Sequence, residues 1–315
     1  MILNIVLLVL GFVLLIKGAD MLIDGASSLA LNLKIPKILI GLTIVAFGTS
    51  APELAVSINA RISGSDDIVI GNVLGSSIFN TLLIIGIAAL IKSIKVNIDT
   101  IKKELPLQLI LSILLVVLML DINLDGTLTN LITRSDALAI TLFFAIFIYY
   151  LISVSHKKTI FKERAPFKIP KSIAFAMLGL VSLIYGSNLV VDNATNIAKI
   201  IGVSDRIIAL TIVAFGTSLP ELITSIESIR KGEDELLLGN IIGSNIFNIC
   251  IVLAIPIAIF GTIEASDFSL IDIVAFIIAA LVLFIVAKTK NEISKKEGIL
   301  MILLFIIYYS LIFII

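Results

Sequence analysis

Two glutamates, Glu53 and Glu221, lie inside long apolar stretches, and each follows a proline directly. Each is preceded by Gly-Thr-Ser-x-Pro, which places a threonine, a serine and a carboxylate close together. Because proline cannot donate to a helix and crowds the carbonyl four residues earlier, we expect a kink or break that frees carbonyls around Ala46 to Thr49. Carboxylates, hydroxyls and carbonyls are the oxygen ligands that hard cations such as Ca²⁺ bind, about six to eight at a time. The spacing therefore predicts an ion site.

This motif occurs twice at a constant offset of 168 residues. Residues 42–58 read LTIVAFGTSAPELAVSI and residues 210–226 read LTIVAFGTSLPELITSI, with 14 of 17 positions identical. A second block keeps the offset, since residues 71–80 are GNVLGSSIFN and residues 239–248 are GNIIGSNIFN, with 7 of 10 identical. The chain is therefore an internal duplication.

The second block places three polar side chains at i, i+4 and i+8, on one face of a helix. In the two copies these are Asn72, Ser76 and Asn80, and Asn240, Ser244 and Asn248. We expect Ser76, Asn80, Ser244 and Asn248 to line the ion site. For Asn72 and Asn240 we favour hydrogen bonds between helices, with Gly-x-x-x-Gly allowing close approach.

A structural reading of the first motif also exists, because Ser50-x-x-Glu53 is a capping box that begins many helices. A helix cap does not require a carboxylate at membrane depth in two equivalent places, so we favour ion binding. Softer transition metals are not expected, since the single histidine, His156, lies in a polar linker and the single cysteine, Cys250, lies in an apolar run. Calcium or sodium fits this oxygen ligand set best.

The composition predicts the elements that must position these residues. Of 315 residues, 59% are hydrophobic and 15% are charged, with a mean hydropathy of +1.18. These values indicate an integral membrane protein without a large aqueous domain, and equal numbers of basic and acidic residues, 23 each, give no sign of a nucleic-acid partner. Ten spans are expected: 2–19 (or, as a longer alternative, 2–31), 38–60, 68–90, 104–120, 136–153, 172–190, 206–229, 236–260, 270–287 and 298–314.

A basic polar stretch in the middle divides the chain. We expect a first five-helix repeat over 1–153, a short cytoplasmic linker over 154–171, and a second five-helix repeat over 172–315. With that linker inside, 19 of the 23 Lys and Arg residues fall on the inner side, which places both termini outside the cytoplasm. Because each repeat has an odd number of spans, the second is inverted. The expected fold class is all-α integral membrane, with ten transmembrane helices as two inverted repeats and broken helices 2 and 7.

The paired blocks resemble the alpha repeats of the cation/calcium exchanger superfamily, in its sodium/calcium exchanger branch. The resemblance covers nearly the whole chain. It implies that helices 2, 3, 7 and 8 surround the ions through Ala46, Thr49, Ser50, Glu53, Ser76 and Asn80, and Ala214, Thr217, Ser218, Glu221, Ser244 and Asn248. Glu53 and Glu221 would share Ca²⁺ with the carbonyls of Thr49 and Thr217. The serines and the carbonyls of Ala46 and Ala214 would form flanking Na⁺ sites.

The resemblance also implies the activity: an antiporter of the plasma membrane, not an enzyme, that exchanges Na⁺ for Ca²⁺ by alternating access. No cofactor, nucleic acid or obligatory protein partner is expected beside the two ions and the lipid bilayer. The alternative is an H⁺/Ca²⁺ antiporter of the same superfamily, whose Gly-Asn-x-x-Glu signature is missing after Gly71 and Gly239. Many relatives, including the potassium-dependent branch, have Asp where this chain has Asn248, so K⁺ co-transport is not expected.

Overall fold

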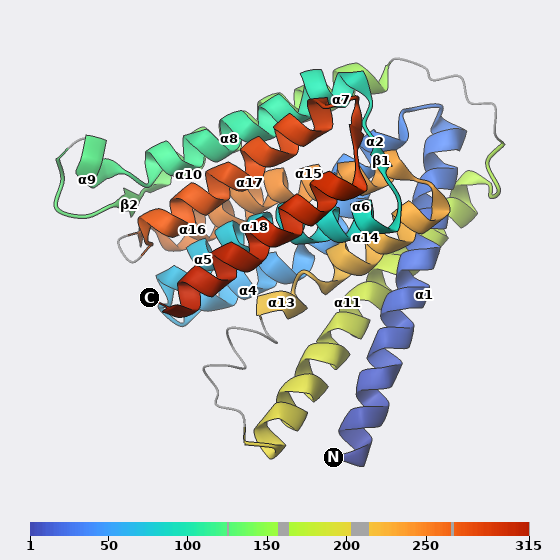
Figure 1. The fold of residues 1–315 in the computed structure, drawn as a ribbon, viewed down its shortest axis with the longest axis horizontal. Coiled ribbons are helices and arrows are strands. Elements are labelled where there is room, and N and C mark those ends of the chain that lie inside the picture. The colour runs from blue at the N-terminus through green and yellow to red at the C-terminus, as the bar shows by residue number, and fades with distance from the viewer. Residues whose placement is uncertain (125, 157–163, 203–213, 266–267, 315) are drawn as a thin grey trace. The chain divides into compact units, whose positions relative to one another are not determined.

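The computed structural model describes residues 1–124, 126–156, 164–202, 214–265 and 268–314. Nearly all of the described elements are helices (Figure 1). The chain divides into two units, each built from both sequence halves. The first unit comprises Met1–Pro52 and Lys157–Asn240, and the second comprises Glu53–His156 and Ile241–Ile315.

Two 32-residue helices, α1 (Ile2–Leu33) and α11 (Ile169–Ile200), form the long axis of the first unit. They lie side by side, as the blue and yellow-green ribbons show in Figure 1. Glycines allow this close approach: a Cβ atom on Gly179 would lie 2.5 Å from the backbone nitrogen of Leu22. Leu15, Leu22 and Leu183 are fully buried in the resulting apolar core. Small residues at such a crossing let helix backbones pack without bulky side chains between them.

The rest of the first unit carries the first proline motif as far as Pro52 and the whole of the second motif. Its further elements are α2 (Lys37–Ile40), the π-helix η1 (Gly41–Val45), α3 (Ala46–Thr49), α13 (Ala214–Gly216) and α14 (Leu219–Lys231). Helix α14 packs against α1 and α11, and α3 packs against α11 and α14. The long helices thus support both motif segments of this unit.

The second unit contains most of the remaining helices. They are α4 (Ala51–Ile62), α5 (Asp66–Ile78), η2 (Phe79–Ile84), α6 (Ile85–Ile91), α7 (Ile98–Lys102), α8 (Glu104–Leu118), α9 (Asp121–Leu124), α10 (Arg134–Ser155), α15 (Asp234–Phe247), η4 (Asn248–Leu253), α16 (Ala254–Phe260), α17 (Leu270–Lys288) and α18 (Lys295–Ile314). The first residues of α4 and α15 lie in the first unit. Helices α10 and α17 begin with capping boxes at Thr133 and Ser269, which satisfy backbone donors of the first turn.

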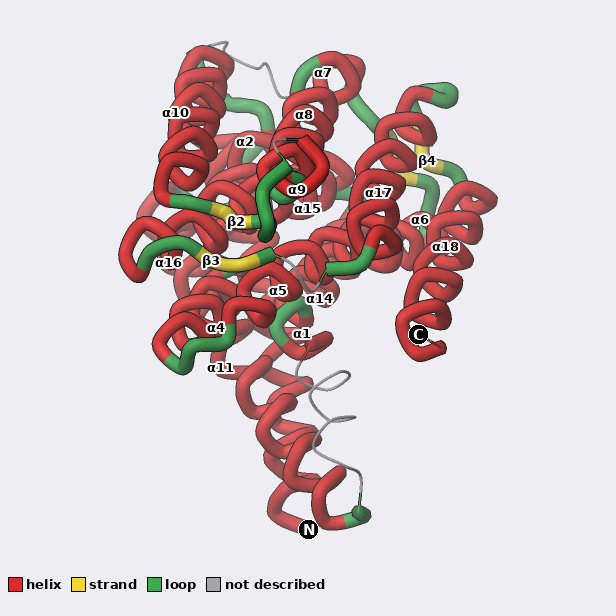
Figure 2. The backbone as a smooth tube through the Cα atoms, turned by 90° about the vertical axis from the view of Figure 1, so that its left-hand side faces the viewer, coloured by secondary structure: helices red, strands yellow, loops and turns green. Residues whose placement is uncertain are grey.

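Two short antiparallel strand pairs join loops of the second unit. Strand β1 (Ile94–Lys95) pairs with β4 (Glu292–Ile293), and β2 (Leu131–Ile132) pairs with β3 (Ile263–Glu264). Figure 2 shows β2 and β3 as neighbouring yellow segments. Each pair ties a connection of the first sequence half to one of the second.

Six helical segments of the described chain are long and apolar enough to cross a bilayer. They are Ile2–Leu33, Asp66–Ile91, Arg134–Ser155, Ile169–Ile200, Asp234–Phe260 and Leu270–Lys288, and the bent pair Lys37–Thr49 and Ala51–Ile62 makes a seventh if it counts as one span. Helices α8, α14 and α18 occupy the other expected spans. Of the span expected over 206–229, residues 206–213 lie outside the described part of the chain. Residues 157–163 of the expected linker lie outside it as well.

Candidate ion-binding site

The proline motifs break their helices as predicted, and both copies break in the same conformation. Ser50 ends α3 with φ −85° and ψ 7°, and Ser218 precedes α14 with φ −86° and ψ 6°. The segments before and after Ser50, Lys37–Thr49 and Ala51–Ile62, are bent by 43°. Glu53 and Glu221 therefore lie in the first turn of a restarting helix, where backbone N–H groups favour a negative charge.

The carbonyl groups near the first break differ from the expectation in one respect. The carbonyl of Ala46 is not left free, because it accepts a hydrogen bond from the backbone N–H of Ser50 (3.0 Å). The Thr49 hydroxyl also lies 3.3 Å from it. The reason is geometric: Pro52 removes its own N–H, and the helical partner of that group is the carbonyl of Gly48 rather than that of Ala46.

At the second break, a side chain satisfies the carbonyl that proline leaves. Pro220 cannot donate to the carbonyl of Gly216, and the hydroxyl of Ser187 in α11 donates to it instead (2.7 Å). Ser187 is 2% exposed. Its counterpart 168 residues earlier is Ala19, which has no hydroxyl. The repeated pattern therefore gave no indication of Ser187.

In the first unit, the structure brings together four polar side chains of the two motifs. The hydroxyl of Ser50 donates to Oε1 of Glu221 (3.2 Å), and the hydroxyl of Thr49 donates to Oδ1 of Asn240 (3.0 Å). All four residues are 0% exposed. Ser218 is also buried, at 1% exposure, whereas Thr217 is partly exposed. Ala214 begins α13.

In the second unit, α4 and α5 are joined through Asn72. Its side-chain amide donates to the carbonyl of Glu53 (2.9 Å) and to the hydroxyl of Ser57 (3.0 Å). Asn240 makes the equivalent contact to Ser225 in the first unit (3.4 Å). The hydrogen bonds between helices that we expected of Asn72 and Asn240 are thus present in both copies.

Two amide oxygens in the second unit are buried acceptors without a donor among the described residues: Oδ1 of Asn80 and Oδ1 of Asn248. Both residues are 0% exposed. The Nδ2 group of Asn248 donates to the hydroxyl of Ser76 (2.8 Å), and this hydroxyl in turn donates to the carbonyl of Asn72 (2.6 Å). Each amide is therefore oriented through its nitrogen, which leaves its oxygen available to a cation.

Asn245 is a positioning residue that the sequence analysis missed. Its Oδ1 accepts from Nδ2 of Asn80 (3.4 Å), and its own Nδ2 donates to the hydroxyl of Thr81 (2.8 Å). Its counterpart in the first repeat is Ser77, so the duplication does not mark it. Asn80 lies in η2 and Asn248 begins η4, and π-helical turns often occur at functional sites. The remaining candidate, Ser244, is buried in α15.

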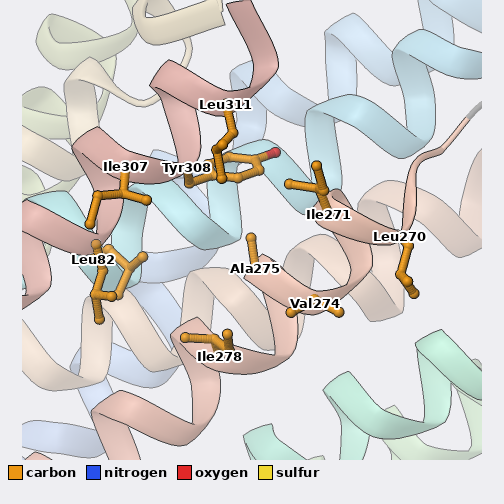
Figure 3. Close-up of a pocket in the computed structure, with 10 residues that line it drawn as sticks. Leu82, Leu270, Ile271, Val274, Ala275, Ile278, Ile307, Tyr308 and Leu311 are labelled. Carbon is orange, nitrogen blue, oxygen red and sulfur yellow. The ribbon is translucent and has the colours of Figure 1, made fainter. Parts of the chain in front are cut away.

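An apolar cavity of about 300 Å³ lies elsewhere in the second unit, between α17, α18 and Leu82 (Figure 3). Leu, Ile, Val and Ala residues line it together with Tyr308. None of its described lining residues is a carboxylate, so this lining is unsuited to a cation. Among the described residues, no group of three or more His, Cys, Asp or Glu side chains could hold a metal ion. An ion site built from the described residues would therefore combine at most two carboxylates with neutral oxygens.

Comparison with known proteins decides the family. A family model described as "Sodium/calcium exchanger protein" matches residues 3–153 and 171–314, which is nearly the whole chain. The chain belongs to the sodium/calcium exchanger family. The two matched segments coincide closely with the two predicted repeats.

Relatives within the sodium/calcium exchanger family match over most of their length. "Putative antiporter CaxA" of Alkalimonas amylolytica is 39% identical over 91% of both chains. "Sodium/calcium exchanger MaX1" of Methanosarcina acetivorans is 31% identical over 91% of this chain and 92% of that protein. A solved structure of the sodium-calcium exchanger NCX_Mj, soaked with Na⁺ and Ca²⁺, has a TM-score of 0.85 and 30% identity over 98% of both chains. The chain is thus similar to exchangers in sequence and in fold.

Proposed function

We propose that this protein is a secondary active antiporter that exchanges Na⁺ for Ca²⁺ across the membrane by alternating access. The observation that carries the proposal is the duplicated, fully buried glutamate, Glu53 and Glu221, each in the first turn after a helix break. A buried carboxylate at membrane depth is costly unless it serves a purpose, and cation transport is the usual one. The relatives named as sodium/calcium exchangers support the choice of ions.

In this proposal the two motif copies supply one shared ion site. Glu53 and Glu221 bind Ca²⁺ with the carbonyls of Thr49 and Thr217. The flanking Na⁺ ligands and site-lining oxygens come from Ser50, Ser218, Ser76, Ser244, Asn80, Asn248 and the carbonyls of Ala46 and Ala214. The buried acceptor oxygens of Asn80 and Asn248 support their place in this set, because a cation would supply the partner that no described donor gives them.

Charge balance explains why transport would be an exchange. Two carboxylates are neutralised by one Ca²⁺ or by two Na⁺, and an empty site would carry two buried charges that oppose the conformational switch. A third Na⁺ would make exchange electrogenic. The membrane potential would then change the free energy of each exchange cycle by about 2.3 kcal/mol per net charge moved per 100 mV. Ca²⁺ and Na⁺ are then the substrates, and the cycle needs no cofactor.

The proposed topology has ten transmembrane helices in two inverted five-helix repeats, 1–153 and 172–315, joined by a cytoplasmic linker over 154–171. Both termini face away from the cytoplasm. The support is the charge distribution, with 19 of 23 basic residues on one side, and the 168-residue duplication. Labelling of single cysteines introduced near each terminus with a membrane-impermeant reagent would test this orientation.

Proton coupling is the second candidate, because one relative, CaxA, is named as a putative antiporter without a specified ion. Against it, the residues after Gly71-Asn72 and Gly239-Asn240 lack the glutamate of the proton-coupled signature. Sodium coupling is therefore the preferred assignment.

Neutral glutamine variants test the site. In Glu53→Gln and Glu221→Gln, we expect Na⁺-driven ⁴⁵Ca²⁺ uptake into proteoliposomes to be lost while the protein remains folded, because one carboxylate cannot balance Ca²⁺. Glu227→Gln is the matched control, since Glu227 lies in α14 and forms long ion pairs with Arg230 (3.7 Å) and Lys231 (4.0 Å). Normal uptake by a folded Glu53→Gln or Glu221→Gln protein would overturn the ligand assignment.

A further inference from the structure

A third buried acid, besides Glu53 and Glu221, lies outside the proposed ion site in the second unit. Glu104 is the first residue of α8 and is 2% exposed. The hydroxyl of Tyr150 in α10 donates to its Oε1 atom. Its Oε2 atom is buried and has no hydrogen-bond partner among the described residues. An ionised carboxylate held by a single donor away from water is unfavourable.

A second acceptor lies one helical turn further along. Gln108 is 3% exposed, and its Oε1 atom also has no hydrogen-bond partner among the described residues. Side chains at i and i+4 are neighbours on a helix surface. Oε2 of Glu104 and Oε1 of Gln108 are therefore neighbouring buried acceptors on α8, and no described residue donates to either. A proton bound to Glu104 would provide the missing donor.

The cation next to Glu104 in the sequence is already engaged. Lys103 forms an ion pair with Asp99 (3.1 Å). Helices α7, α10 and α17 and the π-helix η4 pack against α8. The titratable or charged residues that these elements and their ends carry, besides Glu104, are Asp99, Lys102, Lys103, Arg134, Asp136, Tyr149, Tyr150, His156, Cys250, Asp272 and Lys288. Of these described residues, only Tyr150 forms a hydrogen bond with Glu104.

The second repeat contains a matching pair with different chemistry. Asp272 lies 168 residues after Glu104, and its Oδ1 atom accepts from the hydroxyl of Tyr308 in α18 (3.0 Å). Tyr308 is the tyrosine labelled in Figure 3. The other oxygen of Asp272 accepts from the backbone N–H (3.0 Å) and the hydroxyl (2.7 Å) of Ser269. With three donors, Asp272 suits an ionised carboxylate, whereas Glu104 with one does not.

We propose that Glu104 is a proton-binding site, in which Oε2–H donates to Oε1 of Gln108 while Oε1 accepts from Tyr150. This arrangement gives each of the three polar groups a partner. The position of Glu104 at the start of α8 favours a negative charge, but that effect is smaller than the cost of removing a carboxylate from water. The proton is resident between α8 and α10 and is separate from the transported ions.

Infrared difference spectroscopy of the full-length protein at neutral pH tests this directly. The carboxylic acid C=O band should be present in the wild type, lost in Glu104→Gln and retained in the matched control Asp272→Asn. In Tyr150→Phe the band should persist and shift to higher frequency, because its C=O loses a hydrogen bond. Glu104→Gln and wild-type spectra that are identical in this region would overturn the proposal.

The pH dependence of thermal unfolding gives an independent measurement. The folded protein keeps this proton, whereas the unfolded chain releases it above about pH 4.3, so the wild-type Tm should fall as the pH is raised from the acidic range through neutral pH. The glutamine of Glu104→Gln keeps the bond from Tyr150, can donate to Gln108 and takes up no proton on folding. Its Tm should therefore match the wild type at acidic pH and exceed it increasingly as the pH rises through neutral. Parallel Tm–pH curves for the two proteins would contradict a neutral Glu104.

Discussion

The hydroxyl of Ser50 donates a hydrogen bond to Oε1 of Glu221 at 3.2 Å, although the two residues are 171 positions apart in the sequence. Each belongs to a different copy of the duplicated motif. Both side chains are 0% exposed, so this contact lies away from bulk solvent. Within the first unit, one motif copy thus contributes a donor to the carboxylate of the other.

Ser50→Ala removes that donor and one proposed Na⁺ ligand. A hydrogen bond to a charged group contributes about 1.5–3 kcal/mol, which corresponds to a tenfold or greater loss of apparent Na⁺ affinity. The measurement is the Na⁺ concentration dependence of Ca²⁺ exchange in proteoliposomes. Ser63→Ala is the control, because the Ser63 hydroxyl donates only to carbonyls of α4 near an exposed loop. An unchanged Na⁺ dependence in Ser50→Ala would remove Ser50 from the site.

Ser187→Ala should destabilise the first unit by about 1–3 kcal/mol, because it leaves the carbonyl of Gly216 without a donor beside Pro220. Ser182→Ala is the matched control in the same helix. The Ser182 hydroxyl donates to the carbonyl of Leu14 (2.9 Å), which keeps its helical donor in α1. Thermal or denaturant unfolding should therefore show a clearly smaller loss for Ser182→Ala. Equal losses would show that the proline break does not depend on Ser187.

Lys231, at the end of α14 and beyond the predicted span, pairs with Asp20 and Asp24 of α1 at 2.5 Å each. Burial acts to lower the pKa of Lys231, but hydrogen bonds and attraction from the two carboxylates outweigh it and raise the pKa above 10.5. A raised pKa stabilises the folded state below about pH 10.5, and this contribution is lost as the pH rises through the folded value.

Lys231→Met should therefore lower the Tm at neutral pH, and the Tm difference from the wild type should shrink as the pH rises beyond about 10.5. Taking the difference between two proteins removes the effect of the other lysines. A Tm difference that stays constant across this pH range would show that the ion pairs with Asp20 and Asp24 do not stabilise the fold.

Asn248→Asp tests the charge of the proposed site. The new carboxylate cannot donate to Ser76 as Nδ2 of Asn248 does, and it would add a third negative charge beside the ions. We expect stronger inhibition of Ca²⁺ exchange by protons and altered selectivity among monovalent cations, measured by uptake at several pH values and in Na⁺ or K⁺. Asn59→Asp, at an exposed position of α4, is the control. Unchanged selectivity and pH dependence would mean that Asn248 does not face the ions.

The duplication made the proline breaks predictable. Identical motifs in equivalent apolar stretches gave identical backbone conformations at Ser50 and Ser218. The hydrogen bonds of Asn72 and Asn240 followed from the same repetition. Ala46 was wrongly expected to have a free carbonyl, because the loss of one N–H at Pro52 affects the carbonyl of Gly48.

Other features were not predictable because they depart from the repeat or lack a local signal. Ser187 and Asn245 replace Ala19 and Ser77 of the first half, so their roles depend on contacts that a sequence comparison does not contain. The π-helical turns at Asn80 and Asn248 change the helix register without a distinctive residue pattern. The two-residue strands that join distant loops are too short for an alternating pattern.

The most direct test of Na⁺-for-Ca²⁺ exchange is ⁴⁵Ca²⁺ uptake into proteoliposomes loaded with Na⁺ and diluted into Na⁺-free buffer, compared with a pure pH gradient at matched membrane voltage. We predict uptake driven by the Na⁺ gradient, none driven by the pH gradient alone, and none in Glu53→Gln liposomes. Uptake driven only by the pH gradient would contradict the account and assign proton coupling instead.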